Sequence, residues 1–176
     1  MALRDWARLF VRVVVRRCWE RGARHHERVQ VRTRRLTLRP FRSDDVAAFE
    51  AFALARAYRR FLGDHPYPAE FVTNNVGVDG AWVVELNERV VGSVFLGEQL
   101  ACLLAPSVHG MGIGAEAVRA VINDGFERRG YEEIVARADP DNIASLRALE
   151  RLGFRAREDG TYRLERSDWQ RNDEPR

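Results

Sequence analysis

A glycine-rich turn, Gly110-Met111-Gly112-Ile113-Gly114, connects an apolar, strand-like run to an amphipathic helix, and it constrains the fold more than any other feature. Glycine has no Cβ, so a ligand can approach the backbone, and it readily adopts the positive φ angles that point successive N–H groups at one place. The first turn of the helix adds unpaired N–H groups and the positive end of the helix dipole. The stretch therefore predicts a phosphate-binding loop or, in the plainer interpretation, only a tight turn.

The pattern around this turn predicts one α/β domain. Apolar and polar residues alternate in segments that we interpret as strands at 29–40 (29–33 and 35–40 together forming the first), 81–86, 89–96, 98–105, 131–138, 154–157 and 162–166. Helices are expected after the capping residue Ser43, over 68–75, over 113–128 and from Asn142. Asn87-Glu88 predicts a short hairpin turn, and the helical crossover over 113–128 predicts that the strands on either side of it are parallel.

Composition narrows the class of protein. With 176 residues and 45% hydrophobic content, the chain can bury one full core. Its two cysteines, Cys18 and Cys102, form neither a metal-ligand spacing nor a disulfide framework, and the absence of lysine excludes lysine-nucleophile chemistry. The longest apolar run, Leu9–Val15, is interrupted by Arg12 and is too short to span a bilayer. We expect a cytoplasmic protein without a metal site.

The net charge of +3 hides a strong asymmetry along the chain. Residues 1–35 hold 11 arginines against three acidic residues, whereas residues 36–176 are net acidic. Arginines recur every four residues opposite an apolar stripe in residues 1–28, which predicts a basic amphipathic arm. This arm could dock on protein, on an anionic membrane or on nucleic acid, or it could be an adventitious extension. The domain proper is expected at 29–170, followed by a polar tail at 171–176.

A second motif changes the interpretation of the glycine turn. Residues 139–154, DPDNIASLRALERLGF, follow a strand-like run, open with helix-capping residues and end in Gly153-Phe154. The two motifs together resemble the GCN5-related N-acetyltransferases (GNAT), whose acetyl-CoA motif reads Gln/Arg-x-x-Gly-x-Gly/Ala and whose next helix begins with Asn. Residues 34–40 and 162–169 also resemble the ribosomal-protein branch of that superfamily, the RimJ/RimL type. The resemblance covers most of residues 33–169 and implies a mixed, mostly antiparallel sheet of about six to seven strands flanked by helices.

The resemblance also implies a binding site for acetyl-CoA. The pyrophosphate would lie on the N–H groups of Gly110 to Ala115, and the pantetheine arm would pair with the exposed edge near Leu103 and Leu104. The family carries Gln or Arg where this chain has His109, which supplies fewer donors. The residues expected to bind the cofactor are Leu103, Leu104, His109, Gly110, Met111, Gly112, Ile113, Gly114, Ala115, Asn142 and Ser145.

For catalysis the resemblance points to Ser145 as the group that hydrogen-bonds the departing sulfur. Many relatives have a tyrosine for this role at the position of Leu149. Leucine has no hydroxyl, so Leu149 cannot hydrogen-bond the sulfur. A glutamate that relays the amine proton aligns with Gln99, and the neighbouring Glu98 is the other candidate. Each of these residues also has a plainer interpretation, in which Asn142 and Ser145 only start a helix and Glu98 is a solvated strand residue.

The implied reaction is direct transfer of acetyl to a primary amine, and this amine substrate is the expected partner. The first candidate for the acceptor is the α-amine of a protein or peptide, the second is a small amine and the third is an aminoacyl-tRNA. The sequence also leaves open whether the protein is a homodimer. Two other classes remain. One is a non-catalytic binding protein on this scaffold. The other is a dinucleotide-binding domain. Two observations argue against it: residues 106–109 separate the strand from the first glycine, and the chain after the motif is too short to complete a doubly wound sheet.

Overall fold

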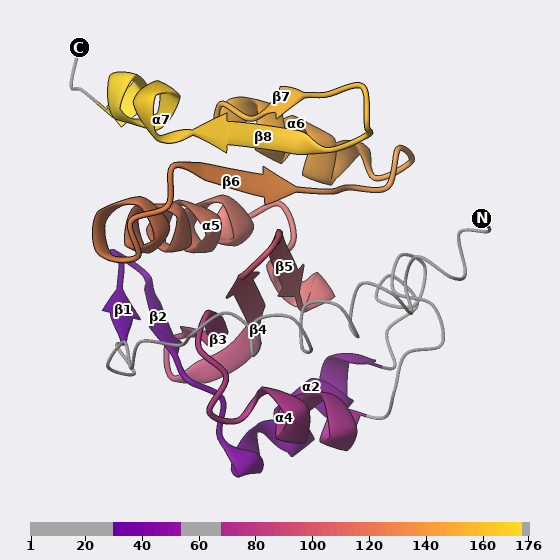
Figure 1. The fold of residues 1–176 in the computed structure, drawn as a ribbon. Helices are drawn as coiled ribbons and strands as arrows, with labels where there is room; N and C mark the ends of the chain where they lie inside the picture. The colour runs from indigo at the N-terminus through magenta and orange to yellow at the C-terminus, as the bar shows by residue number, and fades with distance from the viewer. Residues whose placement is uncertain (1–29, 54–67, 174–176) are drawn as a thin grey trace.

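An eight-stranded sheet runs through the part of the chain that the structure describes, residues 30–53 and 68–173 of a computed structural model (Figure 1). In sheet order the strands are β1 (Val31–Arg32), β2 (Leu36–Arg39), β3 (Ala81–Leu86), β4 (Arg89–Leu96), β5 (Leu100–Leu104), β6 (Glu133–Ala136), β8 (Tyr162–Glu165) and β7 (Arg155–Ala156). Neighbouring strands are antiparallel except β5 and β6, which are parallel. The mixed, mostly antiparallel sheet is confirmed, and a doubly wound parallel sheet is excluded for the described residues.

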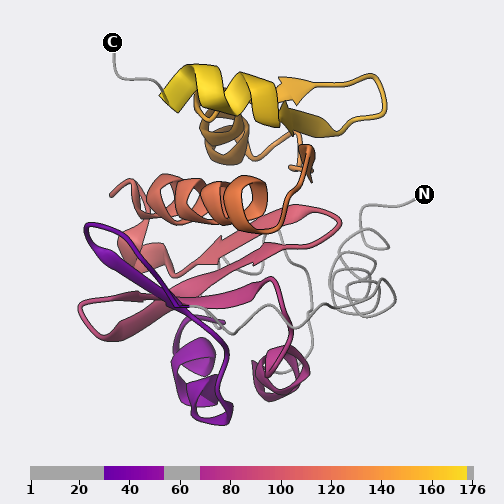
Figure 2. The same cartoon turned by 60° about the vertical axis from the view of Figure 1, so that its left-hand side comes forward.

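Helices cover both faces of the sheet. They are η1 (Ser43–Asp45), α2 (Val46–Ala53), α4 (Pro68–Asn75), η2 (Pro106–Val108), α5 (Ile113–Asn123), which continues as the π-helix η3 (Asp124–Arg128), α6 (Ile143–Arg151) and α7 (Arg166–Asp173). Figure 2 shows α5 on one side of the sheet and α2 and α4 on the other. The predicted crossover helix therefore lies between the parallel strands β5 and β6, as expected.

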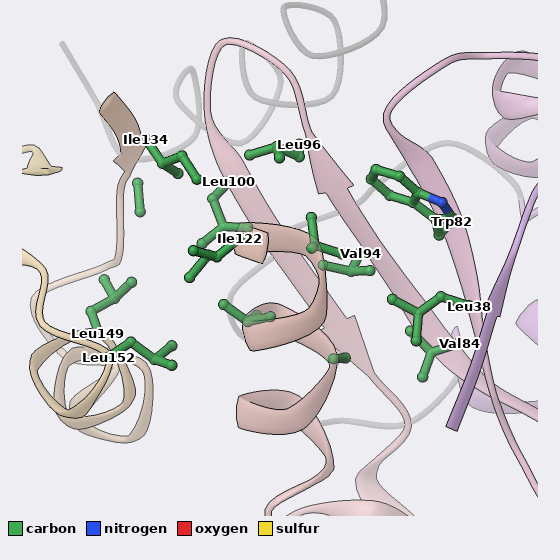
Figure 3. Close-up of a cluster of buried hydrophobic side chains, with 14 of the residues drawn as sticks. Leu38, Trp82, Val84, Val94, Leu96, Leu100, Ile122, Ile134, Leu149 and Leu152 are labelled. Carbon is green, nitrogen blue, oxygen red and sulfur yellow. The ribbon is translucent and has the colours of Figure 1, made fainter. Parts of the chain in front are cut away.

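The main hydrophobic core lies between α5 and the sheet (Figure 3). Ile122 of α5 belongs to the same cluster as the fully buried strand residues Val94 and Leu38. The same cluster continues through Ile134 of β6 to Leu149 of α6, so one core joins the two parts of the sheet. A smaller cluster under α2 and α4 contains Phe41, Phe49, Phe71 and Phe95, whose ring centroids lie 5.4 to 5.9 Å apart where they are paired.

The first strand of the sheet differs from the prediction. Residues 29–40 do not form one strand, because Thr33 turns the chain and makes β1 and β2 an antiparallel hairpin. The Thr33 backbone N–H donates to Leu36 O at 2.9 Å, and Thr33 Oγ1 accepts from Leu36 N–H at 2.9 Å. The expected six to seven strands therefore become eight.

The end of the domain also differs. The last strand was expected at 162–166 and β8 ends at Glu165, but the helix that follows it, α7, was not predicted. Trp169 is buried on this helix, its Nε1–H donates to Asn123 Oδ1 at 2.7 Å, and the guanidinium of Arg119 lies 4.8 Å from its ring centroid. Contacts with residues of α5 more than 40 positions earlier in the chain therefore hold this segment against the domain.

Other predictions are confirmed or lie outside the described residues. Asn87 and Glu88 connect β3 and β4 with φ angles of 49° and 63°, the left-handed conformations that a two-residue hairpin turn requires. The basic arm predicted at 1–28 and residues 174–176 lie outside the description. Among the helices that are described, none has the length and apolar content needed to cross a membrane.

Candidate active site

The glycine turn lies at the carboxyl end of β5 and begins α5. Gly110 and Gly112 have φ angles of 77° and 74°, and Gly112 is the left-handed N-cap residue of the helix. The turn also approaches the sheet closely at Gly114, where a Cβ would lie 3.2 Å from Leu104 Cδ1 and the leucine side chain would have to shift by a few tenths of an ångström. The predicted strand, turn and helix are thus all present, with the positive φ angles that the motif implied.

The backbone amides of the turn divide into two groups. The N–H of His109 donates to Pro106 O at 3.2 Å, and the N–H of Met111 donates to Val108 O at 3.4 Å. Within the described chain no acceptor is recorded for the N–H groups of Gly110 and Gly112, nor for those of the first helical turn, residues 113–115; the first helical bond runs from Glu116 N to Gly112 O. These unpaired donors at a helix N-terminus form a cradle suited to an anion.

A contact that sequence reasoning missed ties this cradle to the β1–β2 hairpin. Arg35 Nε donates to Glu116 Oε2 at 2.7 Å, and Arg35 Nη1 donates to Met111 O at 3.0 Å. Glu116 Oε1 also accepts from Thr33 Oγ1 at 2.5 Å and from Arg35 N at 3.0 Å. Burial alone would raise the pKa of Glu116, but the hydrogen bonds from Thr33 and Arg35 outweigh it and lower the pKa below the ordinary value of 4.5. More than 80 residues separate the hairpin from Glu116, so no local pattern predicts the contact.

The lowered pKa of Glu116 makes this contact dependent on pH. A carboxyl group whose pKa is lower in the folded state stabilises the fold above its unfolded pKa and loses that contribution as the pH falls below it. At pH 7 we expect Glu116→Gln to be about 1–2 kcal/mol less stable than the wild type. The difference should shrink progressively as the pH falls below 4.5. Urea unfolding at pH 7, 5 and 3.5 measures it, and a difference that is constant across this range would contradict the prediction.

The backbone carbonyls of Leu103 and Leu104, the two residues expected to bind the pantetheine arm, point in opposite directions. A Cβ at Gly92 would overlap the carbonyl of Leu103, so that carbonyl faces β4. Since carbonyl directions alternate along a strand, the carbonyl of Leu104 points to the opposite edge, toward β6. There His109 Nε2 lies 3.1 Å from Leu104 O, which places the imidazole beside the strand end.

The edge of β5 on this side is largely open because its partner strand diverges. The pairing of β5 with β6 has a single register pair, Leu100↔Ala136, after which β6 ends and the chain continues to α6. Within residues 30–53 and 68–173, residues 101–104 of β5 therefore have no ladder partner on this side. An open strand edge flanked by two helix N-termini can accept an extended amide-containing ligand.

Asn142 and Ser145 lie at the N-terminus of α6. Asn142 is its N-cap residue, and its Oδ1 accepts from Ser145 N at 3.2 Å. The expected cap is thus present, and the hydroxyl of half-buried Ser145 has no recorded partner among the described residues. Leu149, which replaces the tyrosine of many relatives, is buried in the main core.

The expected strand at Glu98 and Gln99 is wrong. Both residues lie in the bend between β4 and β5, where Gly97 N donates to Gln99 O at 3.5 Å, and β5 begins only at Leu100. Glu98 is exposed and Gln99 is half-buried. The alternation that would point one of them away from the site does not apply in a bend, because Gly97 and the turn hydrogen bond interrupt the extended backbone.

Metal-ligating side chains do not gather at this site. In residues 30–53 and 68–173, no group of three or more His, Cys, Asp or Glu side chains could hold a metal ion. What the structure offers is a backbone cradle, an open strand edge and one hydroxyl. These are the donors of a site for a phosphate-bearing, amide-containing ligand.

Comparisons with known proteins agree with this geometry. The family described as "Acetyltransferase (GNAT) domain" matches residues 35–155, well over half of the chain. The uncharacterised N-acetyltransferase YnaD of Bacillus subtilis is 22% identical over 141 residues, 72% of this chain and 83% of that protein. The structure of the aminoglycoside acetyltransferase AAC(6′)-Ib in complex with coenzyme A superposes with a TM-score of 0.66 at 20% identity, covering 77% of this chain and 98% of that one. Mycobacterium smegmatis RimJ in complex with CoA-disulfide superposes with a TM-score of 0.64 at 20% identity, covering 76% and 83%.

The family match and the structural likeness concern the same part of the chain. The matched residues 35–155 run from β2 to β7 and include the glycine turn and the start of α6. The chain therefore belongs to the GNAT family and is an acetyl-CoA-dependent N-acetyltransferase.

Proposed function

We propose that this enzyme transfers acetyl from acetyl-CoA to the α-amine of a protein or peptide. The observation that carries the proposal is the glycine cradle at the end of β5, next to the open edge of that strand. This arrangement can hold the diphosphate of the cosubstrate at one end and receive its thioester along the strand.

The residues present fit acetyl-CoA. The open N–H groups of Gly110, Gly112 and residues 113–115 would bind the pyrophosphate, and the edge of β5 near Leu104 would bind the pantetheine amides. Asn142 Nδ2 is a further donor at the start of α6, because its Oδ1 is already used by the helix cap. His109 would act at the strand end, where its ring already contacts Leu104 O.

In the reaction the neutral amine attacks the thioester carbonyl, and the C–S bond breaks to release a thiolate that needs a proton. Ser145 is the hydroxyl we assign to hydrogen-bond this sulfur. Glu98 and Gln99, in the bend before Leu100, stay predictions for relaying the amine proton through water. Holding the amine beside the thioester would supply much of the remaining rate.

The energetics of the amine favour an N-terminus. At pH 7 a lysine amine costs roughly 4–5 kcal/mol to deprotonate, whereas an α-amine costs roughly 1 kcal/mol. Of the two residues we predict to relay the amine proton, only Glu98 carries a carboxylate and it is exposed, so the acceptor with the lower pKa is the better match. One similar structure, from Vibrio cholerae, is named for a ribosomal-protein-serine acetyltransferase, and that name supports a protein acceptor here.

A small-molecule amine is the second candidate acceptor. Its support is the similar structure of AAC(6′)-Ib, which is named as an aminoglycoside acetyltransferase. The two candidates differ in the acceptor only, and both use the same cosubstrate site.

A thiol-release assay with acetyl-CoA tests the proposal. The full chain is incubated at pH 7 with a panel of peptides that have free N-termini, the same peptides with blocked N-termini, polyamines and aminoglycosides. We expect turnover with free peptides that is lost on blocking, and mass spectrometry should place the acetyl group on the α-amine. Turnover with small amines alone would replace the proposed acceptor. Binding of acetyl-CoA without any turnover would indicate a binding protein.

A further inference from the structure

The guanidinium of Arg35 borders the glycine cradle from the β1–β2 hairpin. A Cβ built at Gly112 would lie 3.5 Å from Arg35 Nη2, in open space otherwise. Because Gly112 is the residue whose missing Cβ leaves room for a phosphate, this distance puts Arg35 Nη2 at the rim of the proposed anion site. The side chain of Arg35 is 33% exposed, so a ligand in the cradle can reach it.

A count of donors shows which part of Arg35 is free. The guanidinium has five N–H hydrogens in a fixed plane. Nε uses its hydrogen on Glu116 Oε2, and Nη1 uses one on Met111 O. Among the described residues no acceptor is recorded for Nη2, so both of its hydrogens are available beside Gly112.

Glu116 and Thr33 hold this guanidinium in place before any ligand binds. Glu116 is 19% exposed and accepts hydrogen bonds on both of its oxygens, from Thr33 and from the backbone and side chain of Arg35. A donor whose orientation is already fixed loses little conformational freedom on binding. The hairpin therefore presents Arg35 to the cradle as a preorganised group.

The glycine loop has no arginine of its own, so a guanidinium from the hairpin would add positive charge at the cradle. The chain has no arginine between residues 105 and 118, and the imidazole of His109 lies against Leu104 O at the end of β5. Arg119, the next arginine along α5, stacks over the ring of Trp169. Within residues 106–118, a diphosphate in the cradle would otherwise meet backbone dipoles and the imidazole of His109.

We propose that Arg35 is a cofactor-binding residue whose Nη2 donates to a pyrophosphate oxygen of acetyl-CoA. This inference rests on the proposed function, because it takes the glycine cradle to be the pyrophosphate site. It assigns a guanidinium contact with the pyrophosphate to a residue about 75 positions before the glycine motif.

Binding of three related ligands to Arg35→Gln tests the inference. CoA and dephospho-CoA both contain the pyrophosphate, only CoA contains the 3′-phosphate, and pantetheine contains neither. We expect Arg35→Gln to weaken CoA and dephospho-CoA equally, by about ten- to thirtyfold, as measured by calorimetry. Pantetheine binding, measured by ligand-observed NMR, should not change. Arg34→Gln is the matched control, since it removes the same charge from an exposed neighbour in the same turn and should change none of the three.

The results that would contradict this inference differ from the result that would contradict the proposed function. An equal loss for pantetheine would mean that Arg35 only positions the loop, and a loss for CoA but not for dephospho-CoA would move the contact to the 3′-phosphate; either result overturns the inference. If the wild type bound CoA and Arg35→Gln bound it with the same affinity, this inference would be wrong but the proposed function would stand. If the wild type bound no CoA, the proposed function would fall with it. Should Arg35→Gln not fold, Arg35→Lys, which keeps the charge but lacks the fork, is expected to show about a threefold loss with the same ligand pattern.

Discussion

Gly112→Val is expected to weaken acetyl-CoA binding by at least about a hundredfold, the largest effect of any single substitution considered for this enzyme. Gly112 has a φ of 74°, a conformation in which valine is strained, and its Cβ would lie 3.5 Å from Arg35 Nη2. The branched side chain would fill the space where we place a phosphate and would remove two or three charge-assisted hydrogen bonds, each worth about 1.5–3 kcal/mol. Calorimetric titration with acetyl-CoA measures the loss.

Backbone strain alone must be separated from loss of the phosphate site. Gly160, in the turn between β7 and β8, has the same φ of 74° and no heavy atom within 4 Å of a built Cβ. Gly160→Val therefore carries a similar backbone penalty far from the cradle. We expect both variants to unfold at lower urea concentrations than the wild type, but only Gly112→Val to lose acetyl-CoA affinity. Equal affinities in the two variants would contradict the placement of the pyrophosphate.

Ser145→Ala is expected to reduce kcat by about a hundredfold and to change the Kd for acetyl-CoA by no more than about threefold. One well-placed donor to a developing negative charge contributes a factor of about 100 or more, because it acts in the transition state and not in the ground state. The cap of α6 should survive, since Asn142 Oδ1 binds the backbone N–H of residue 145 and not its side chain. Steady-state thiol release together with calorimetry separates the two parameters.

Ser167→Ala is the control for this variant. Ser167 is an exposed serine in the first turn of α7, so it occupies a comparable helical position away from the cradle. It should leave kcat and Kd at their wild-type values. If Ser145→Ala also retained the wild-type kcat, the hydroxyl would have no role in departure of the thiolate, and its position would reflect only the start of a helix.

Local sequence patterns predicted most of the secondary structure. The alternating runs at 81–86 and 89–96 are β3 and β4 with unchanged bounds, and the turn at Asn87-Glu88 has the predicted left-handed geometry. The helix predicted at 113–128 is present as α5 and its π-helical continuation. These elements could be predicted because their signals, namely side-chain periodicity, caps and turn residues, act over a few neighbouring residues.

The candidate site was predictable only in part. The glycines and the Asn142 cap have local signals and are found where expected. The bend at Glu98, by contrast, interrupts a stretch that alternates like a strand. The clamp between Arg35 and Glu116 joins segments 81 residues apart, and an arginine followed by an alternating run has no local feature that marks it as part of a phosphate site.

The sequence by itself therefore determined the order of the strands and helices from β3 to β8, the glycine cradle and its place before α5, because each follows from the conformational preferences of adjacent residues. Only the tertiary structure decided that residues 29–40 divide into a hairpin, that Trp169 is buried against α5, and that Arg35 borders the cradle. These outcomes depend on contacts between distant segments, whose free energies exist only once the sheet and α5 have come together.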